Sequence, residues 1–458
     1  MKSLIKIWLA VFVLALCGAA SAESYVWVGT GTNDWKTLSC WQKEGGAAAT
    51  KLPGASDEVS LPAPNEGGCG VFADAAIDVR SLTIGSETAS GGTVTFESRT
   101  LETHRIGAGG LVVRAGGAMT HTPLPTSAKT IAEERYKLNV SVAGDVTITA
   151  DGKIDVTGCG YFGSRTPAFI QGPGAINTGN GTTSYAAHGG AHYVGDSYGS
   201  LTSPTNCGSS GYFSGTAWPG GGAIKLTFGG ALVLDGELSA NGKTGDYYTG
   251  SGGSIWLTAA SVSGTGTISA QGGDGTQQSF GGGGRVAIYL TQATSMDGFK
   301  KPVTVRGGIH TTGQYLGLAD AAPGTYYLET VADEPGAGTL LLAGYKDHQT
   351  IQEANYRTEL TPVEPTVSNE TKKVVVVVKD EAYASITRDA WVEDITIPDA
   401  TSRLYLNGYT LHVHTRRHAL GKNEAVQVIP GERTDPETGE TITGKIEWLK
   451  PGLVIIVK

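Results

Sequence analysis

Histidine and aromatic side chains gather in one glycine-rich stretch of the chain, residues 158–221. Aromatic rings stack on the C–H faces of sugars, and imidazole, carboxylate and guanidinium groups form hydrogen bonds with sugar hydroxyls. These residue types would allow contact with a polysaccharide or a host or cell-surface glycan through Tyr185, His188, His192, Tyr193, Tyr198 and Trp218, with further hydrogen bonds from Arg165 and Asp196. The interpretation we favour for this stretch is that the rings pack it against the rest of the protein, because aromatic side chains mostly serve as packing area.

A second group of histidines is His412, His414 and His418 in the segment LHVHTRRH. Residues two apart on a strand share a face, so His412 and His414 point the same way, as metal ligands do. No carboxylate lies near them in the sequence, and Arg416 and Arg417 repel a cation. We therefore expect an exposed strand face, and we expect neither a metal nor another cofactor.

Four cysteines follow residue 22, namely Cys40, Cys69, Cys159 and Cys207. An even number of cysteines in an exported chain indicates disulfides, and four cysteines allow three pairings. We favour Cys40 with Cys69 and Cys159 with Cys207, because each pair belongs to one region of the chain. No two of them have the close spacing of a zinc-binding pair.

A glycine-rich repeat organises the middle of the chain. The segments GGAIKL, GGSIWL and GGRVAI end at Leu226, Leu257 and Ile288, and in each one two apolar residues alternate with an outward position. Short strands separated by glycine turns cannot bury an apolar face alone, so such repeats must stack. The repeat predicts an all-β fold in which Ile224, Ile255 and Val286 lie in line and face inward.

Residues 1–22 are typical of a secretory signal peptide: Lys2 and Lys6 precede an apolar core, and Ala-Ser-Ala forms the cleavage site. The chain is expected outside the cell or on its surface, with the periplasm as an alternative. Removing the two lysines changes the net charge from −9 to −11. That charge argues against nucleic acid as a partner, and no second apolar run is long enough to span a membrane.

Three regions follow the signal. Residues 23–137 are expected to form an N-terminal cap and the first coils, with Trp27, Trp35 and Trp41 covering the open end of the core. Residues 138–330 hold the glycine-rich repeats and the long insertion 158–221. Residues 331–458 contain less glycine and more charge, and they predict a C-terminal β unit, either further coils or a small sandwich, with a tight turn at Asn407-Gly408.

The motifs together resemble a known group of proteins. The glycine-rich units from Leu138 to Glu329 are similar to exported bacterial surface proteins with a right-handed parallel β-helix of the pectin-lyase-like superfold, and YVWVGTGTNDWKTLSCW resembles the opening of autotransporter passenger repeats. The resemblance implies a solenoid with a structural, adhesive or glycan-contact role. It carries no catalytic residues to this chain.

The alternative is a polysaccharide lyase or glycoside hydrolase on the same scaffold. Polygalacturonases of this superfold have clustered aspartates with Gly-His-Gly and Arg-Ile-Lys elements, and this chain contains neither element. Asp145, Asp151, Asp155, Asp235 and Glu237 are scattered at turns. A groove lined by several charged residues would favour the enzyme, whereas a flat face of small polar residues would favour the structural role.

Overall fold

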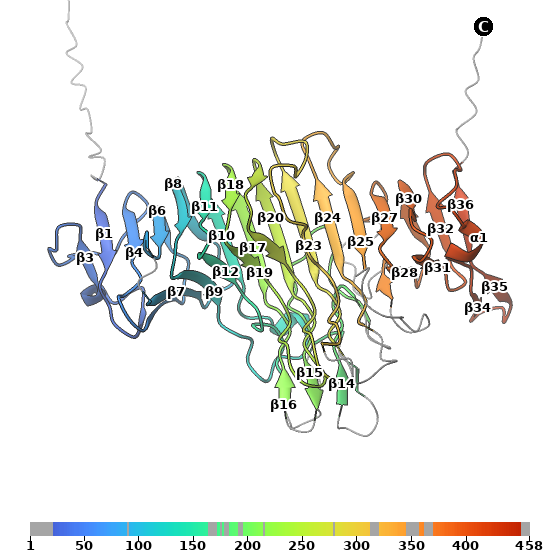
Figure 1. The fold of residues 1–458 in the computed structure, drawn as a ribbon, viewed down its shortest axis with the longest axis horizontal. Coiled ribbons are helices and arrows are strands. Elements are labelled where there is room, and N and C mark those ends of the chain that lie inside the picture. Colours follow the sequence, from blue (N-terminus) through green and yellow to red (C-terminus); the bar gives the residue numbers. More distant parts are fainter. Residues whose placement is uncertain are drawn as a thin grey trace, which may run out of the picture.

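The computed structural model describes residues 22–88, 91–163, 172–174, 176–177, 183–190, 196–213, 216–277, 280–311, 320–344, 357–360 and 370–449; at 176, 177, 183–185, 213 and 359 only the backbone is described. Residues 1–21 of the predicted signal peptide lie outside this part of the chain. Strands dominate, and they follow one another in a row from β1 and β3 at one end to β36 at the other (Figure 1).

The largest sheet, called here the first sheet, has 16 strands. In spatial order they are β3 (Trp41–Lys43), β1 (Ser24–Trp27), β4 (Glu58–Leu61), β6 (Asp78–Ile84), β8 (His104–Val113), β10 (Leu138–Val142), β17 (Ala223–Phe228), β20 (Ser254–Ala259), β23 (Arg285–Leu290), β24 (Thr325–Glu329), β25 (Thr339–Ala343), β27 (Val375–Lys379) and β30 (Asp394–Thr396), joined by β11 (Val146–Ile148), β18 (Leu232–Leu234) and β21 (Val262–Ser263). Only β1–β3 and β24–β25 pair antiparallel among its described pairs.

The second sheet is parallel throughout its described pairs. It contains β2 (Thr32–Asp34), β5 (Gly68–Ala73), β7 (Thr93–Ser98), β9 (Gly117–His121), β12 (Lys153–Asp155), β19 (Glu237–Ser239) and β22 (Thr267–Ser269). The chain alternates between the two sheets, so residues far apart in sequence lie side by side.

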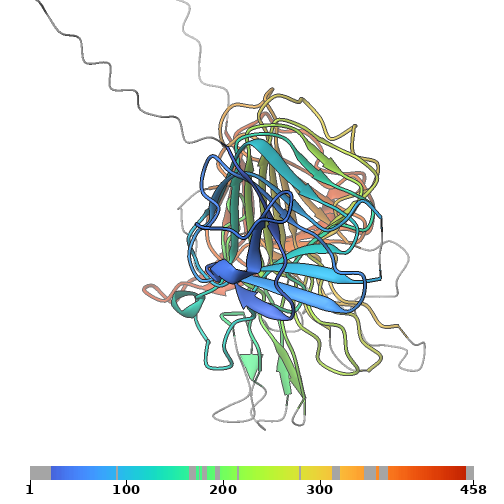
Figure 2. The same cartoon turned by 90° about the vertical axis from the view of Figure 1, so that its left-hand side faces the viewer.

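Smaller elements complete the fold. The insertion forms a sheet of β13 (Ile176–Asn177), β14 (Thr183–Tyr185), β15 (Gly211–Phe213) and β16 (Thr216–Trp218), which projects from one side (Figures 1 and 2). The C-terminal region has β26 (Thr358–Glu359), β28 (Tyr383–Ser385), β31 (Arg403–Tyr405) and β33 (Val428–Ile429) in one sheet, β29 (Ala390–Val392), β32 (Thr410–Val413) and β36 (Lys445–Trp448) in another, and a hairpin of β34 (Glu432–Thr434) and β35 (Thr441–Thr443). The described helices are short: η1 (Leu38–Cys40), η2 (Ile131–Glu133) and α1 (Glu424–Gln427).

The predicted register of the repeat is confirmed. Ile224 pairs with Ile255 and Ile255 pairs with Val286, and all three side chains are buried in one apolar core. Lys225 and Trp256 occupy the next register position and are half-buried on the other face of the sheet. Side-chain alternation along a strand explains both observations.

Glycine pairs ahead of the repeat strands allow backbones to approach closely. A Cβ atom on Gly253 would overlap the carbonyl oxygen of Gly222, and one on Gly284 would overlap that of Gly253. Neither glycine has a positive φ. Besides forming turns, glycine therefore provides the space in which one repeat packs on the next.

The N-terminal end of the core is covered as predicted. Trp27, Trp35 and Trp41 are buried, and the rings of Trp27 and Trp35 each pack edge-on against Trp41, with ring centroids 4.9 and 4.7 Å away. The Trp41 indole N–H donates to the Trp35 carbonyl oxygen at 2.8 Å. Strand β3 pairs antiparallel with β1 and forms a short edge strand at this end of the first sheet.

The C-terminal strands belong to a second core on the opposite face of the first sheet. Val286 and Ile288 face the first core, whereas Ala287 and Tyr327 belong to a separate apolar cluster with Leu340 and the strands beyond. The antiparallel pair β24–β25 lies where the first core gives way to the second core along the sheet. Ala287 is consequently buried, although it faces away from the first core as expected.

Parallel pairing continues into this second unit. Val375 pairs with Asp394 on β30, and Ala390 pairs with Leu411. The second core is lined by β25, β27 and β30 of the first sheet and by strands of the two short parallel sheets that contain β28 and β29. Asn407 and Gly408 both have positive φ, at 49° and 80°, as the predicted tight turn requires.

The expected disulfides are not formed in the structure, where Cys40, Cys69, Cys159 and Cys207 are free thiols. Burial raises the pKa of the Cys159 thiol to about 11 and that of Cys207 well above its usual value. Cys159 packs into the first core, whereas Cys207 packs with Tyr161 in a separate small cluster, so each sulfur is held by its own surroundings.

Candidate functional site: an aromatic face on the first sheet

The insertion histidine His188 is a buried anchor. Its ring is fully buried, its Nδ1–H donates to the Gly252 carbonyl oxygen at 2.8 Å, and its centroid lies 4.6 Å from that of Tyr198. Arg285 Nε donates to the Tyr198 carbonyl oxygen at 2.8 Å. Burial, together with the positive charge of Arg285, lowers the pKa of His188 to about 3, so the ring is neutral.

These contacts correct the expectation that His188 and Tyr198 reach a glycan. Tyr198 is buried as well, and its hydroxyl donates to the Cys207 carbonyl oxygen at 2.6 Å. Trp218 is half-buried and Asp196 is exposed. The other expected contacts lie outside the described residues or side chains, namely Tyr185, His192, Tyr193 and Arg165. The packing alternative therefore describes the buried residues of the insertion.

A buried carboxylate holds another part of the insertion. Glu134 accepts hydrogen bonds from the Tyr161 hydroxyl at 2.9 Å and from the backbone N–H of Cys207 at 3.0 Å, and it pairs with Lys137 at 2.8 Å. Burial raises its pKa despite these partners. Every partner satisfies the carboxylate internally, so the group fixes the insertion in place.

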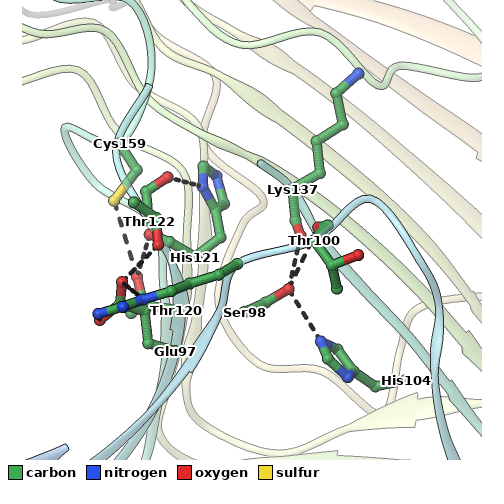
Figure 3. A network of polar contacts seen from close by, with 10 residues as sticks. Glu97, Ser98, Thr100, His104, Thr120, His121, Thr122, Lys137 and Cys159 are labelled. Atoms are coloured by element: carbon green, nitrogen blue, oxygen red, sulfur yellow. Dashed lines mark hydrogen bonds and ion pairs between the residues drawn. The ribbon is translucent and has the colours of Figure 1, made fainter. Parts of the chain in front are cut away.

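The polar network in Figure 3 is also closed. Thr122 and Arg99 donate to the Glu97 carboxylate, and the buried ring of His104 contacts the Ser98 hydroxyl at 2.9 Å. His121 donates from Nδ1 to the Thr122 carbonyl oxygen at 2.8 Å and accepts the Ala223 N–H at Nε2. Burial lowers the pKa of each of these two histidines to about 4. Their nitrogens serve internal hydrogen bonds.

The C-terminal histidines have carboxylate partners that the sequence did not reveal. His412 Nδ1 lies 3.2 Å from Glu447, His414 Nδ1 lies 3.4 Å from Glu393, and His418 Nε2 lies 2.7 Å from Asp394. These acids come from neighbouring repeats.

Carboxylates that are distant in the sequence therefore do neighbour these histidines. The expected exposed strand face is found only in part, because all three side chains are half-buried and only His412 lies on a strand, β32. Within the described part of the chain, no group of three or more histidine, cysteine or acidic side chains is arranged to hold a metal.

The outer face of the first sheet carries a different arrangement. Strands β17, β20 and β23 present Lys225, Trp256 and Tyr289 on the face opposite the first core. The Lys225 ammonium lies 4.0 Å from the Trp256 ring centroid, and the rings of Trp256 and Tyr289 are 6.4 Å apart. All three side chains are half-buried. We call these three residues the aromatic face.

Small polar side chains surround the aromatic face. The outward positions beside it are Asn139, Ser141, Thr227 and Thr258, and none of them is fully buried. Ring surfaces bordered by hydroxyl and amide groups suit a ligand that has apolar C–H faces and many hydroxyls. Sugars have both.

Groups on the same side of the sheet hold Tyr289 in place. The Tyr289 hydroxyl donates to the Thr202 carbonyl oxygen at 2.9 Å, and the Tyr289 ring lies 5.6 Å from buried Tyr327. The Tyr327 hydroxyl in turn donates to Glu329 at 2.7 Å. Fixed rings lose little conformational freedom on binding. The alternation within GGSIWL predicts an outward Trp256, whereas Tyr289 was not predicted; it stands in register with Thr258, one repeat further along the chain.

A cavity of about 400 Å³ lies near the N-terminal end, and its lining includes Asp34, Lys36, Asp74 and Asp78 over apolar residues such as Ile77. It is formed by the turns around β2, β5 and β6, so it is separate from the aromatic face. A hollow lined by several charged side chains is the feature expected of a polysaccharide lyase or glycoside hydrolase.

Comparison with protein-family models, curated proteins and solved structures found no match to this chain. Among the helices that the structure describes, none has the length and apolar character needed to cross a bilayer.

Proposed function

We propose that this protein is an exported right-handed parallel β-helix that acts as a non-catalytic scaffold and contacts glycans through the aromatic face. The parallel strands that pair at regular repeats in two long sheets support the architecture. The predicted signal peptide and the resemblance to exported bacterial surface proteins support a location outside the cell or at its surface.

The observation that carries the glycan role is the half-buried group of Lys225, Trp256 and Tyr289 on the sheet face opposite the first core, where the two rings also pack against the second core. A sheet held on one side by a continuous core is rigid, and rigid aromatic side chains bind with a small entropy loss. The surrounding Ser, Thr and Asn side chains supply hydrogen bonds to hydroxyls.

An adhesive or structural role also fits the chemistry of the buried groups. His104, His121 and His188 are held neutral by burial, and each ring forms at least one hydrogen bond with a backbone or hydroxyl group of the same chain. General acid–base catalysis needs a titrating group near the working pH and within reach of a substrate. These three histidines serve the fold instead.

Binding to a panel of immobilised polysaccharides tests the proposal. We expect the wild-type protein to bind at least one glycan and Trp256→Ala to bind it at least about tenfold more weakly, because stacking on an aromatic ring contributes a large part of such affinity. Trp391→Ala is the matched control, since Trp391 is also half-buried but lies on another sheet. Equal loss in both variants would contradict a role for this face.

The alternative function is a polysaccharide lyase or hydrolase, and the charged cavity at Asp34, Asp74 and Asp78 favours it. The same panel, assayed for new reducing ends and for unsaturated products, separates the two functions. Glycan cleavage that Asp74→Asn abolishes and Trp256→Ala leaves intact would replace the scaffold proposal by the enzyme.

A further inference from the structure

We infer that the aromatic face selects anionic glycans, and that Lys225 is the specificity-determining residue. The inference rests on the proposed function and goes beyond it by naming the class of glycan. A carboxylate or sulfate group on a sugar stacked at Trp256 would lie beside the Lys225 ammonium, which is 4.0 Å from the ring centroid.

Lys225 is available for such a partner. Within the described residues it forms no ion pair, and its charge rests over the Trp256 ring. None of the outward positions of β10, β17 and β20 is acidic; they are Asn139, Ser141, Ala223, Lys225, Thr227, Ser254, Trp256 and Thr258. Although the chain has 43 acidic and 34 basic residues, Lys225 has no acidic neighbour among the outward positions of these three strands. A positive group in such a setting attracts anions.

A second cation extends the same face. Arg105 on β8 is exposed and stands in register with Ser141, whose row continues through Thr227 and Thr258 to Tyr289. Neighbouring strands lie about 4.8 Å apart, so Arg105 and Tyr289 are separated by about 19 Å along the row. A glycan chain that crosses the strands can therefore reach the rings and both cations.

The acidic groups near the face are placed at its ends. Glu329 accepts hydrogen bonds from the Tyr327 hydroxyl and the Gly336 N–H, and Glu370 accepts hydrogen bonds from Ser200 and the Leu201 N–H. Glu329 stands in register with Tyr289, and both carboxylates act electrostatically on the Tyr289 hydroxyl. Asp78 pairs in register with Arg105 at the opposite end. The centre of the face, at Lys225 and Trp256, is where an anion meets the least repulsion.

The lysine can change partners without disturbing the fold. Its flexible stem allows the ammonium to leave the ring and pair with a carboxylate, while the ring then accepts the sugar. A cation–π contact at a partly exposed site is weaker than a charge-assisted hydrogen bond. Binding of an acidic sugar thus exchanges a weak contact for a stronger one.

The experiment compares alginate oligosaccharides, which carry one carboxylate per sugar, with neutral dextran oligosaccharides of the same length. Titration calorimetry is run on the wild type, Lys225→Gln, Trp256→Ala and Lys153→Gln, a half-exposed lysine on the second sheet that serves as the charge control. We expect Lys225→Gln to weaken alginate binding roughly tenfold and to leave any dextran binding unchanged, because only the charged ligand loses a charge-assisted hydrogen bond. Added salt should weaken wild-type alginate binding and affect Lys225→Gln less.

The outcomes are distinct. If Trp256→Ala weakens glycan binding and Lys225→Gln does not, the charge inference fails and the proposed function stands. If no glycan binds the wild type, both fail. Inorganic polyphosphate is a third ligand: polyphosphate binding that needs Lys225 but not Trp256 would identify a general polyanion site and overturn the glycan assignment. Because Trp256 also supports the second core, Thr258→Met provides a test by obstruction of the same face, and it should weaken binding of both glycans.

Discussion

At the scale of single residues, three buried histidines make stability depend on pH. Burial lowers the pKa of His104 and His121 from 6.5 to about 4 and that of His188 to about 3. The unfolded chain therefore binds more protons than the folded chain between pH 6.5 and 4, so the free energy of unfolding falls as pH falls.

We predict a decrease of up to about 1.4 kcal/mol per pH unit for each histidine through this window. Urea unfolding at several pH values measures the slope, and it should be shallower in His121→Gln. His418 provides the opposite case, because its hydrogen bond with Asp394 raises the pKa. Its contribution is present at low pH and is lost as pH rises. A free energy of unfolding that stays constant from pH 6.5 to 4 would contradict the neutral assignment of the buried rings.

At the scale of elements, the glycine pairs set how closely repeats can stack. In Gly253→Ala the new methyl group overlaps the carbonyl oxygen of Gly222. Relieving this overlap must strain the hydrogen bond that the Gly253 N–H donates to the Ala240 carbonyl oxygen, with an N-to-O distance of 2.7 Å. We predict a loss of at least about 2 kcal/mol in the free energy of unfolding. Gly54→Ala is the control, since the nearest atom to its new Cβ is 3.8 Å away. Denaturant unfolding should give a clearly lower free energy of unfolding for Gly253→Ala than for Gly54→Ala. Equal values would contradict the prediction, because they would mean that the strands at Gly222 and Gly253 can move apart to admit a methyl group without loss of stability.

The same elements show which features the sequence could predict. Apolar residues two apart, recurring at the same place in successive repeats, determine the register of Ile224, Ile255 and Val286, because a one-residue slip would turn them to the other face. The role of His188 could not be predicted, since its partners near Gly252 and Arg285 come from repeats far along the chain. The carboxylates beside His412 and His414 were missed for the same reason.

At the scale of the whole molecule, one continuous sheet serves two cores on opposite faces. Strand β24 is the joint, and its sequence TYYLE is apolar on both sides, with Tyr327 facing one core and Tyr326 and Leu328 packed against the other. A strand that is covered on both faces has apolar residues at successive positions instead of an alternating pattern. This loss of alternation in TYYLE is the sequence signal for the change from the first core to the second. The tryptophan cap closes one end, so the stability of each unit depends mainly on its neighbours.

Glu370 joins the insertion to the second unit, and its removal should loosen that joint alone. Its carboxylate accepts the Ser200 hydroxyl at 2.6 Å and the Leu201 N–H at 2.8 Å, and Leu201 is buried in the second core. In Glu370→Gln the amide loses the charge and offers one acceptor in place of two, and each hydrogen bond to a charged group contributes about 1.5–3 kcal/mol. We predict that hydrogen exchange at the Leu201 amide becomes at least about tenfold faster, while exchange in β1 and β4 at the distant N-terminal end stays unchanged.

Glu334→Gln is the matched control, because Glu334 forms an exposed ion pair with Lys373 that contributes little. Faster exchange throughout the molecule in Glu370→Gln would mean that the two units unfold as one, and the joint would then be part of a single cooperative core.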